Sequence, residues 1–442
     1  MCALNYATAT AVTLAARGGA LLLGAITAVV LARGLGPEAR GEYAIVTLLP
    51  LAIVTFANVG LGLATVRRVG RDPTGARVAA TNVVVFTLVA SIVSAAALWS
   101  LAAPIRRVYP AVSDAFLLIV ILAVPQSLAY LLFQALLQAT RAFVLSATLV
   151  ILSYVFQFAL LGILMLSGRL DLTTAIGAWF IAHLLIVVAT AAAIARRTGF
   201  GRLDAASLLG DVRAGSVSWA GNLSVLFTTR AALFIAGAIA DAGSVGLLAV
   251  AIVVAELIWS VPEAAAFSLA PFVAHFGDER SQTITPLITR SVLLLTTLAA
   301  VAVGALAVPL VVLLFGKEFE DASVPLRWLL PGVVGYGLAK VLASDLLGRG
   351  RPDLALRASL AGAGTAVVLS ALLVPTAGIV GGAAATTIAY LVTAAISVAT
   401  FARTAGVDQR SVLVPTLTDV MLLVRRVRAA ALRRPPEERE FP

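Results

Sequence analysis

Apolar stretches of about 20 residues recur along the whole chain, and no other feature constrains the fold as strongly. Each stretch is long enough to cross the ~30 Å hydrocarbon layer of a membrane as a helix. The strands of a membrane barrel would instead alternate apolar and polar residues over about ten positions, which these stretches do not. We therefore predict an all-α polytopic membrane protein with about twelve transmembrane helices. Their expected ranges are 11–32, 43–66, 78–101, 115–138, 143–166, 173–195, 216–239, 246–269, 287–310, 326–347, 355–375 and 378–401.

Composition agrees with a chain that is mostly in lipid. Apolar residues make up 61% of the 442 positions and charged residues only 12%, whereas about a quarter of a soluble domain is charged. The net charge of +10 comes mainly from arginines in short loops, which is how membrane topology is encoded, so we expect no nucleic-acid partner. The single cysteine, Cys2, excludes an internal disulfide and a cysteine metal cluster.

The arginines also predict the orientation. If the N-terminus is cytoplasmic, the inside loops and the C-terminal tail hold about three times as many Lys and Arg residues as the outside loops. The positive-inside rule then places both termini in the cytoplasm of a bacterium, with the chain in its cytoplasmic (inner) membrane.

The longest interior connection divides the chain into two halves of six helices. We predict an N-terminal lobe over 1–197, a cytoplasmic linker over 198–215 and a C-terminal lobe over 216–403. Residues 404–442 are expected to form an amphipathic helix on the anionic leaflet and a disordered tail. Two similar halves are how many transporters are built, with the substrate site between them; chance matching of apolar helices is the alternative. The matched positions are Pro125, Tyr130 and Gln134 with Pro331, Tyr336 and Lys340, and more loosely Gly34–Gly36 and Gly41 with Asp241–Gly243 and Gly246.

Charged residues inside the predicted spans are the candidate site, because each is costly in hydrocarbon unless it faces a cavity or a partner. Arg230 and Glu256 fall at similar depth in the seventh and eighth helices. They can line a charged cavity, or form a structural ion pair between neighbouring helices, or do both. Arg17 in the first helix can line the cavity or extend to the interface.

Lys340 in the tenth helix is a candidate cavity residue. A pair with Asp345 is possible, although a spacing of five residues is poor for one helix face. Glu263 is expected at a solvated helix end, and His183 as a packing residue. An uncharged polar lining comes from amides, some of which must bond backbone or neighbouring helices instead. The amides of the candidate lining are Asn58, Asn222 and Gln134, with Asn82, Gln126, Gln138 and Gln157 as further candidates.

Signals for catalysis are missing from the sequence. Gly316-Lys317-Glu318 lacks the glycine spacing and hydroxyl residue of a nucleotide-binding loop. No paired histidines mark a metal site, and no outside loop is large enough for a glycan polymerase or ligase centre. We therefore predict a protein without catalytic residues, cofactor or metal.

Four motifs in order resemble the polysaccharide-export (Wzx-like) flippases, in the superfamily that also contains MATE exporters and the lipid II flippase MurJ. The similarity covers nearly the whole chain. It departs at 231–233, where many relatives have an acidic residue, and at Leu247, where an aromatic residue is usual. The motifs are Leu31–Glu38 with Gly41–Tyr43 and Gly60–Gly62; Val245–Gly246 through Glu256 to Pro262 and Pro271; Leu314–Gly316 with Phe319; and Leu347–Arg351 followed by Val374–Pro375 and Gly378–Ala383.

The resemblance implies two six-helix lobes that form a V around a central cavity. It also implies alternating access for an undecaprenyl-diphosphate-linked oligosaccharide used in polysaccharide biosynthesis. Arg230, Lys340 and Arg17 suit the diphosphate, because charge-assisted bonds to phosphate are strong. The expected partners are this glycolipid, membrane lipids and a counter-transported cation. Two alternatives stay open: a cation-coupled exporter of small molecules of the MATE type, and a membrane-embedded glycan polymerase or ligase.

Overall fold

A computed structural model describes residues 2–109 and 113–414, apart from the side chains of residues 2–17, 278 and 279. Within these ranges the chain forms helices and no strands. The helices are α1 (Cys2–Ala57), α2 (Leu61–Arg71), η1 (Pro73–Gly75), α3 (Ala76–Ser100), α4 (Ala102–Val108), α5 (Asp114–Ala139), α6 (Phe143–Leu166), α7 (Leu172–Arg197), α8 (Ala205–Ile239), α9 (Ala242–Leu257), α10 (Ser260–Ala305), α11 (Ala307–Phe315), η2 (Lys317–Ala322), α12 (Ser323–Gly348), α13 (Pro352–Ala405) and α14 (Gln409–Leu413).

The described residues form a multi-pass membrane protein. Nine helices are long and apolar enough to cross a membrane, and the bent pair of α9 with the first part of α10 makes a tenth span. Two of the nine, α1 and α13, are each broken by a glycine with positive φ, Gly36 (φ 73°) and Gly378 (φ 57°). Each of these helices is too long for one crossing and turns back at its glycine, so that the fold is in line with the predicted twelve passes.

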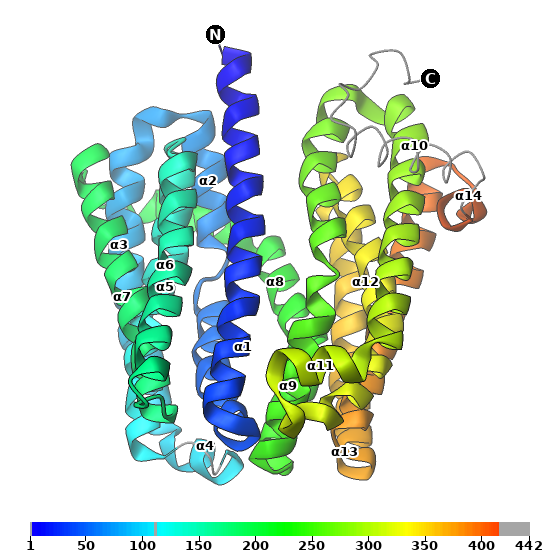
Figure 1. Ribbon diagram of the computed structural model, residues 1–442. Coiled ribbons are helices and arrows are strands. Elements are labelled where there is room, and N and C mark those ends of the chain that lie inside the picture. The colour runs from blue at the N-terminus through cyan, green and yellow to red at the C-terminus, as the bar shows by residue number, and fades with distance from the viewer. Residues whose placement is uncertain (1, 110–112, 415–442) are drawn as a thin grey trace.

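The helices form two bundles that lie side by side (Figure 1). The N-terminal lobe contains α1 to α7, and its core is built from residues such as Leu61, Leu128 and Leu136. The C-terminal lobe contains most of α8 and α9 to α13. The chain begins at the top of Figure 1, and α14 lies at the same end.

The segment that was predicted as a linker is largely helical and is anchored on the N-terminal lobe. The backbone N–H of Gly201 donates to the carbonyl of Arg77 (3.0 Å), and Asn82 bonds the backbone of Asp204. The helix α8 begins directly afterwards, and its 35 residues extend for about 50 Å. One continuous helix therefore connects the two lobes.

One pair of glycines lets the lobes approach at backbone distance. A Cβ at Gly41 on α1 would lie 1.9 Å from the carbonyl oxygen of Ala242 on α9, and one at Gly246 would lie 2.0 Å from that of Pro37. The contact is reciprocal, because each glycine lies against the backbone of the other helix. This is expected if the two halves are related by a pseudo-twofold axis. This crossing lies at the bottom of Figure 1, where Asp241 caps α9; hydrogen bonds from Ser244 lower the pKa of that carboxyl group.

A second close approach joins α2 to α8, where a Cβ at Gly60 would lie 2.2 Å from the carbonyl oxygen of Gly215. Near this contact, Arg68 on α2 forms an ion pair of 2.9 Å with Asp211 on α8, a buried carboxylate. At the bottom, Arg33 donates to the carbonyls of Leu313 and Leu314 at the end of α11. The start of α8 is therefore fixed on the N-terminal lobe, and the two lobes meet at the bottom of the molecule.

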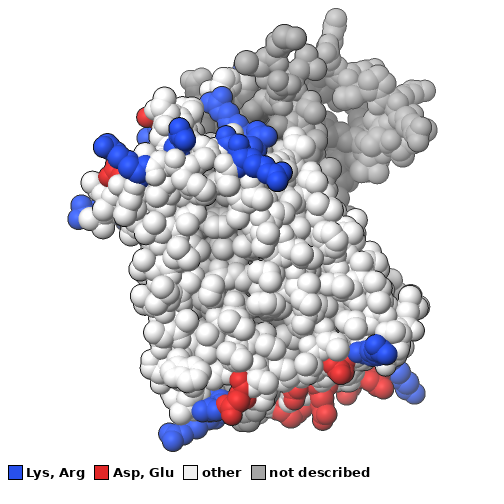
Figure 2. All heavy atoms as spheres, turned by 90° about the vertical axis from the view of Figure 1, so that its left-hand side faces the viewer, with Lys and Arg blue, Asp and Glu red and all other residues white. Residues whose placement is uncertain are grey.

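Charge is distributed unevenly between the two ends of the molecule. Figure 2 shows Lys and Arg gathered at the top of the N-terminal lobe, with few acidic residues among them. Asp and Glu gather at the bottom, together with some basic residues, and the belt between the two ends is uncharged (Figure 2). An uncharged belt between charged ends is what a protein surrounded by lipid requires.

Candidate transport site

Arg230 on α8 and Glu256 on α9 form a bidentate ion pair. The Nη1 and Nη2 atoms of Arg230 donate to the two carboxylate oxygens of Glu256 at 2.5 Å and 3.0 Å. The planar guanidinium matches a carboxylate or a phosphate in this parallel geometry. Each side chain keeps 24% of its surface exposed. The pair is therefore mostly enclosed by protein but remains accessible.

Three aromatic side chains lie beside this pair. Tyr336 on α12 stacks on Tyr390 on α13, with ring centroids 4.6 Å apart, and Trp259 packs against both. The Trp259 indole N–H donates to the carbonyl of Val333 (3.1 Å), which fixes the ring. Both tyrosines interact electrostatically with Arg230 and Glu256. All three rings are almost fully buried and form a rigid support for the site.

Lys340 on α12 also contacts the aromatic cluster. Its ammonium group forms an ion pair of 2.6 Å with Glu263 on α10 and lies 4.0 Å from the centre of the Trp259 ring. Cation–π contact of this kind is favourable where water is partly excluded. Lys340 and Glu263 border a cavity of about 500 Å³ in the C-terminal lobe. The other polar residues of its wall are Tyr336, Ser344, Ser359, Thr393 and Ser397.

Lys340 pairs with Glu263 and not with Asp345, the carboxylate on its own helix. Asp345, the carboxylate considered from the sequence, is fully buried and bonds Arg349 (2.5 Å) and the Thr285 hydroxyl (2.6 Å). A spacing of five residues turns Lys340 and Asp345 to different faces of α12, so each finds a partner on another helix or turn. Glu263, expected only as a solvated helix end, has a side chain 44% exposed and holds the lysine.

Two of the three amides predicted for the lining bond within the N-terminal lobe. Asn58 is buried at the bend between α1 and α2, where it donates to the carbonyls of Val54 and Thr55 and accepts from the Gly60 N–H. Gln134 accepts from the Ser146 hydroxyl (2.7 Å), which joins α5 to α6. Asn222 is exposed on α8. Asn58 and Gln134 therefore form hydrogen bonds inside the N-terminal lobe.

Arg17 is on α1, but its side chain lies outside the described residues. The predicted amphipathic tail also lies outside them beyond residue 414. Among the described residues, no group of three His, Cys, Asp or Glu side chains could hold a metal ion.

The sequence repeat has a counterpart in the packing. Tyr130 on α5 contacts His183 on α7 with ring centroids 5.8 Å apart, and the matched Tyr336 on α12 contacts Tyr390 on α13. His183 also bonds the carbonyl of Trp179 (2.9 Å), in agreement with a packing residue. Both matched tyrosines therefore pack against rings, although the N-terminal position that matches Lys340 holds Gln134.

Solved structures with a similar fold are transporters and flippases. The lipid II flippase MurJ in an inward closed conformation matches with a TM-score of 0.74 and 13% identity, over 96% of this chain and 93% of that chain. The MATE multidrug transporter DinF-BH matches at 0.66 and 14%, over 92% and 96%. An inward-facing MATE family transporter of the MOP superfamily matches at 0.64 and 16%, over 94% and 95%.

No protein-family model matches the chain, and no curated protein matches its sequence significantly. At 13–16% identity the similarity concerns architecture. The chain has the fold of the lipid II flippase MurJ and the MATE transporters.

Proposed function

We propose that this protein is a flippase that moves an undecaprenyl-diphosphate-linked oligosaccharide across the cytoplasmic membrane by alternating access, with both termini in the cytoplasm. The observation that carries the proposal is the pair of basic groups, Arg230 and Lys340, near one rigid aromatic cluster. A membrane-embedded diphosphate needs this kind of charge compensation, since an unpaired charge in hydrocarbon is costly.

The two carboxylates explain how such a site can exist without its substrate. Glu256 and Glu263 neutralise Arg230 and Lys340, so that neither of these two basic groups is a lone charge. An arriving diphosphate exchanges with these carboxylates, because its oxygens fit the same guanidinium fork. The glycan occupies the polar cavity, and the lipid chain stays in the bilayer.

The lobe contacts support alternating access. The glycine crossing at Gly41 and Gly246 brings the backbones of the two lobes together at one end of the molecule, where Arg33 on α1 also bonds the end of α11. Movement of one lobe against the other requires contacts of this kind to form and break in turn. A small reciprocal contact between glycines leaves such movement sterically open.

A second candidate function is a cation-coupled exporter of small molecules. The observation that favours it is the presence of two accessible carboxylates, Glu256 and Glu263, beside an aromatic ring. An organic cation binds carboxylates and aromatic faces. The basic partners of these carboxylates disfavour this function, because each carboxylate is already neutralised.

Transport in reconstituted vesicles separates the two functions. The flippase function predicts that a fluorescent lipid-diphosphate oligosaccharide in one leaflet becomes accessible in the other, and that Lys340→Gln slows this exchange. The exporter function predicts movement of a rhodamine dye driven by an ion gradient. Arg327→Ala, which removes an exposed arginine bonded only to the carbonyl of Gly304 among the contacts described, is the matched control. Dye transport without glycolipid exchange would overturn the proposal.

A further inference from the structure

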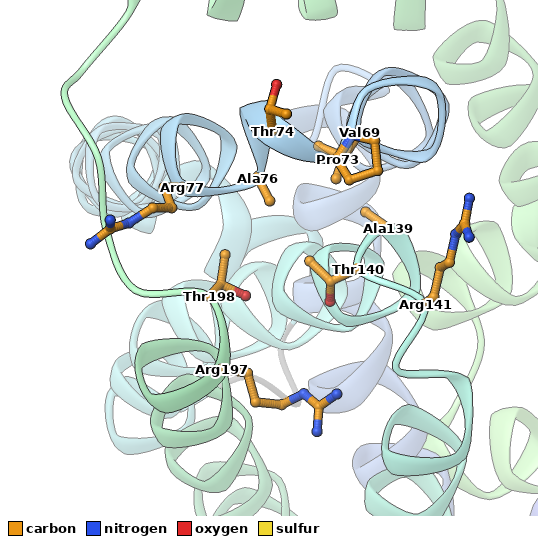
Figure 3. Close-up of a pocket in the computed structure, with 10 residues that line it drawn as sticks. All are labelled: Val69, Pro73, Thr74, Ala76, Arg77, Ala139, Thr140, Arg141, Arg197 and Thr198. Carbon is orange, nitrogen blue, oxygen red and sulfur yellow. The ribbon is translucent and has the colours of Figure 1, made fainter.

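A second basic pocket lies in the N-terminal lobe, where α2, α5 and α7 end and α3 begins. Its volume is about 620 Å³ (Figure 3). Arg77, Arg141 and Arg197 stand around its rim, Thr140 and Thr198 lie between them, and Thr74 also lines the pocket. It belongs to the basic end of the molecule at the top of Figure 2. The site therefore differs in place and composition from the cavity around Lys340.

The charge of this pocket is not compensated by the protein. No Asp or Glu is among its lining residues. Within residues 2–109 and 113–414, the ion pairs of the structure include none of the three arginines. Like charges held around one hollow repel one another, so a bound anion would stabilise this arrangement.

The rim is held in place by the backbone. The loop after α7 bonds the start of α3 through Gly201, whose N–H donates to the Arg77 carbonyl. Gly199, with φ 66°, leaves room for the Arg77 guanidinium, which would lie 3.5 Å from a Cβ at this position. The pocket is therefore a built feature of the fold.

Arg141 has an unfavourable backbone conformation. Its φ is 58°, in the left-handed region that a glycine adopts with less strain. It ends α5 by donating its N–H to the Gln138 carbonyl (3.0 Å). A strained residue that is not glycine is a reason to look for a role of its side chain, and this side chain borders the pocket.

The surroundings fit an amphiphile. The pocket lies at the ends of α2, α5 and α7 and at the start of α3. This level corresponds to the boundary between the hydrocarbon layer and the lipid headgroups. Phe143 and Val144, which follow Arg141 closely in the chain, expose 38% and 53% of their surface on α6. Acyl chains can pack along these side chains while a phosphate lies among the arginines.

We propose that this pocket binds the phosphodiester headgroup of an anionic phospholipid from the surrounding leaflet. Basic pockets between transmembrane helices are suited to such headgroups. Arg77, Arg141 and Arg197 supply the charge, the threonine hydroxyls supply further hydrogen bonds, and α6 supplies the apolar surface. The site does not depend on what the central cavity transports.

Native mass spectrometry of the full-length protein with dioleoyl phosphatidylglycerol or phosphatidylcholine tests the proposal. The wild type should retain phosphatidylglycerol preferentially. Substituting all three pocket arginines with Gln should reduce this preference about a hundredfold, and losing one should reduce it about fivefold. The control replaces three exposed arginines from the same end that do not line the pocket, Arg67, Arg71 and Arg196, with Gln. It should keep most of the preference.

Arg141→Gly gives a second readout that does not depend on the stability of the triple variant. Glycine suits the positive φ, so the thermal unfolding temperature should stay at or above that of the wild type while lipid preference falls. Equal losses in the pocket and control triple variants would show general surface attraction and would overturn the proposal. So would unchanged preference in Arg141→Gly and the pocket variant, or binding of inorganic phosphate without preference for phosphatidylglycerol.

Discussion

Replacing Arg230 with alanine should affect stability and transport in separable ways. The change leaves Glu256 without its two hydrogen bonds, in a position where its side chain is 24% exposed. Breaking a fully buried ion pair costs about 3–5 kcal/mol, and partial exposure reduces this to roughly 2–3 kcal/mol. The folding equilibrium should therefore shift by about 30-fold to 150-fold.

The double variant Arg230→Ala with Glu256→Ala should regain most of this stability, because neither charge is then left unpaired. Transport should not return, since the group that grips the diphosphate is still missing. Arg230→Lys should restore transport only in part, because an ammonium group replaces the fork with a point charge. The three variants thus distinguish a binding residue from one that only neutralises Glu256.

Two measurements on the same preparations are needed. Thermal unfolding in lipid nanodiscs reports stability, and the accessibility of a fluorescent lipid-diphosphate oligosaccharide to an impermeant quencher reports exchange in vesicles. Full transport by Arg230→Ala would refute direct binding at this residue. Full transport by the double variant would do the same, because it would show that the arginine is required only as a counter-charge.

Three further predictions concern topology, lobe contact and stability. Reporter fusions after residues 197 and 434 should both give a cytoplasmic signal, and an external signal at either would contradict the orientation. Gly246→Val should abolish transport in protein that still inserts, because the valine side chain would clash with the Pro37 backbone. Gly221→Val is the control, since no atom lies within 4 Å of a Cβ at Gly221. Equal transport activity of the two variants would exclude a role for the crossing. Asp345→Ala should cost about 3–5 kcal/mol, since it removes the carboxylate that pairs with the buried Arg349 side chain; thermal unfolding unchanged from the wild type would show that this pair does not stabilise the lobe.

The number of passes and the all-helical class could be predicted because both depend on local sequence. A helix must be about 20 apolar residues long to cross a membrane, and this length can be counted along the chain. The repeat could also be found, since Tyr336 and Tyr130 occupy matched positions. Gly36 and Gly378, where long helices reverse, lie at or between the ends of neighbouring predicted spans.

Tertiary structure decided which charges meet. Depth along two helices brought Arg230 and Glu256 together as candidates, but only packing could show the paired hydrogen bonds between them. Lys340 pairs with Glu263, 77 positions away, rather than with Asp345 on its own helix. Such partners depend on how helices rotate and cross, which is set by side-chain packing over the whole lobe. The pocket of Arg77, Arg141 and Arg197 arises in the same way, from helix ends that the fold brings to one level. Hydropathy is a property of each segment and determined the passes, whereas the sites are properties of the assembled bundle.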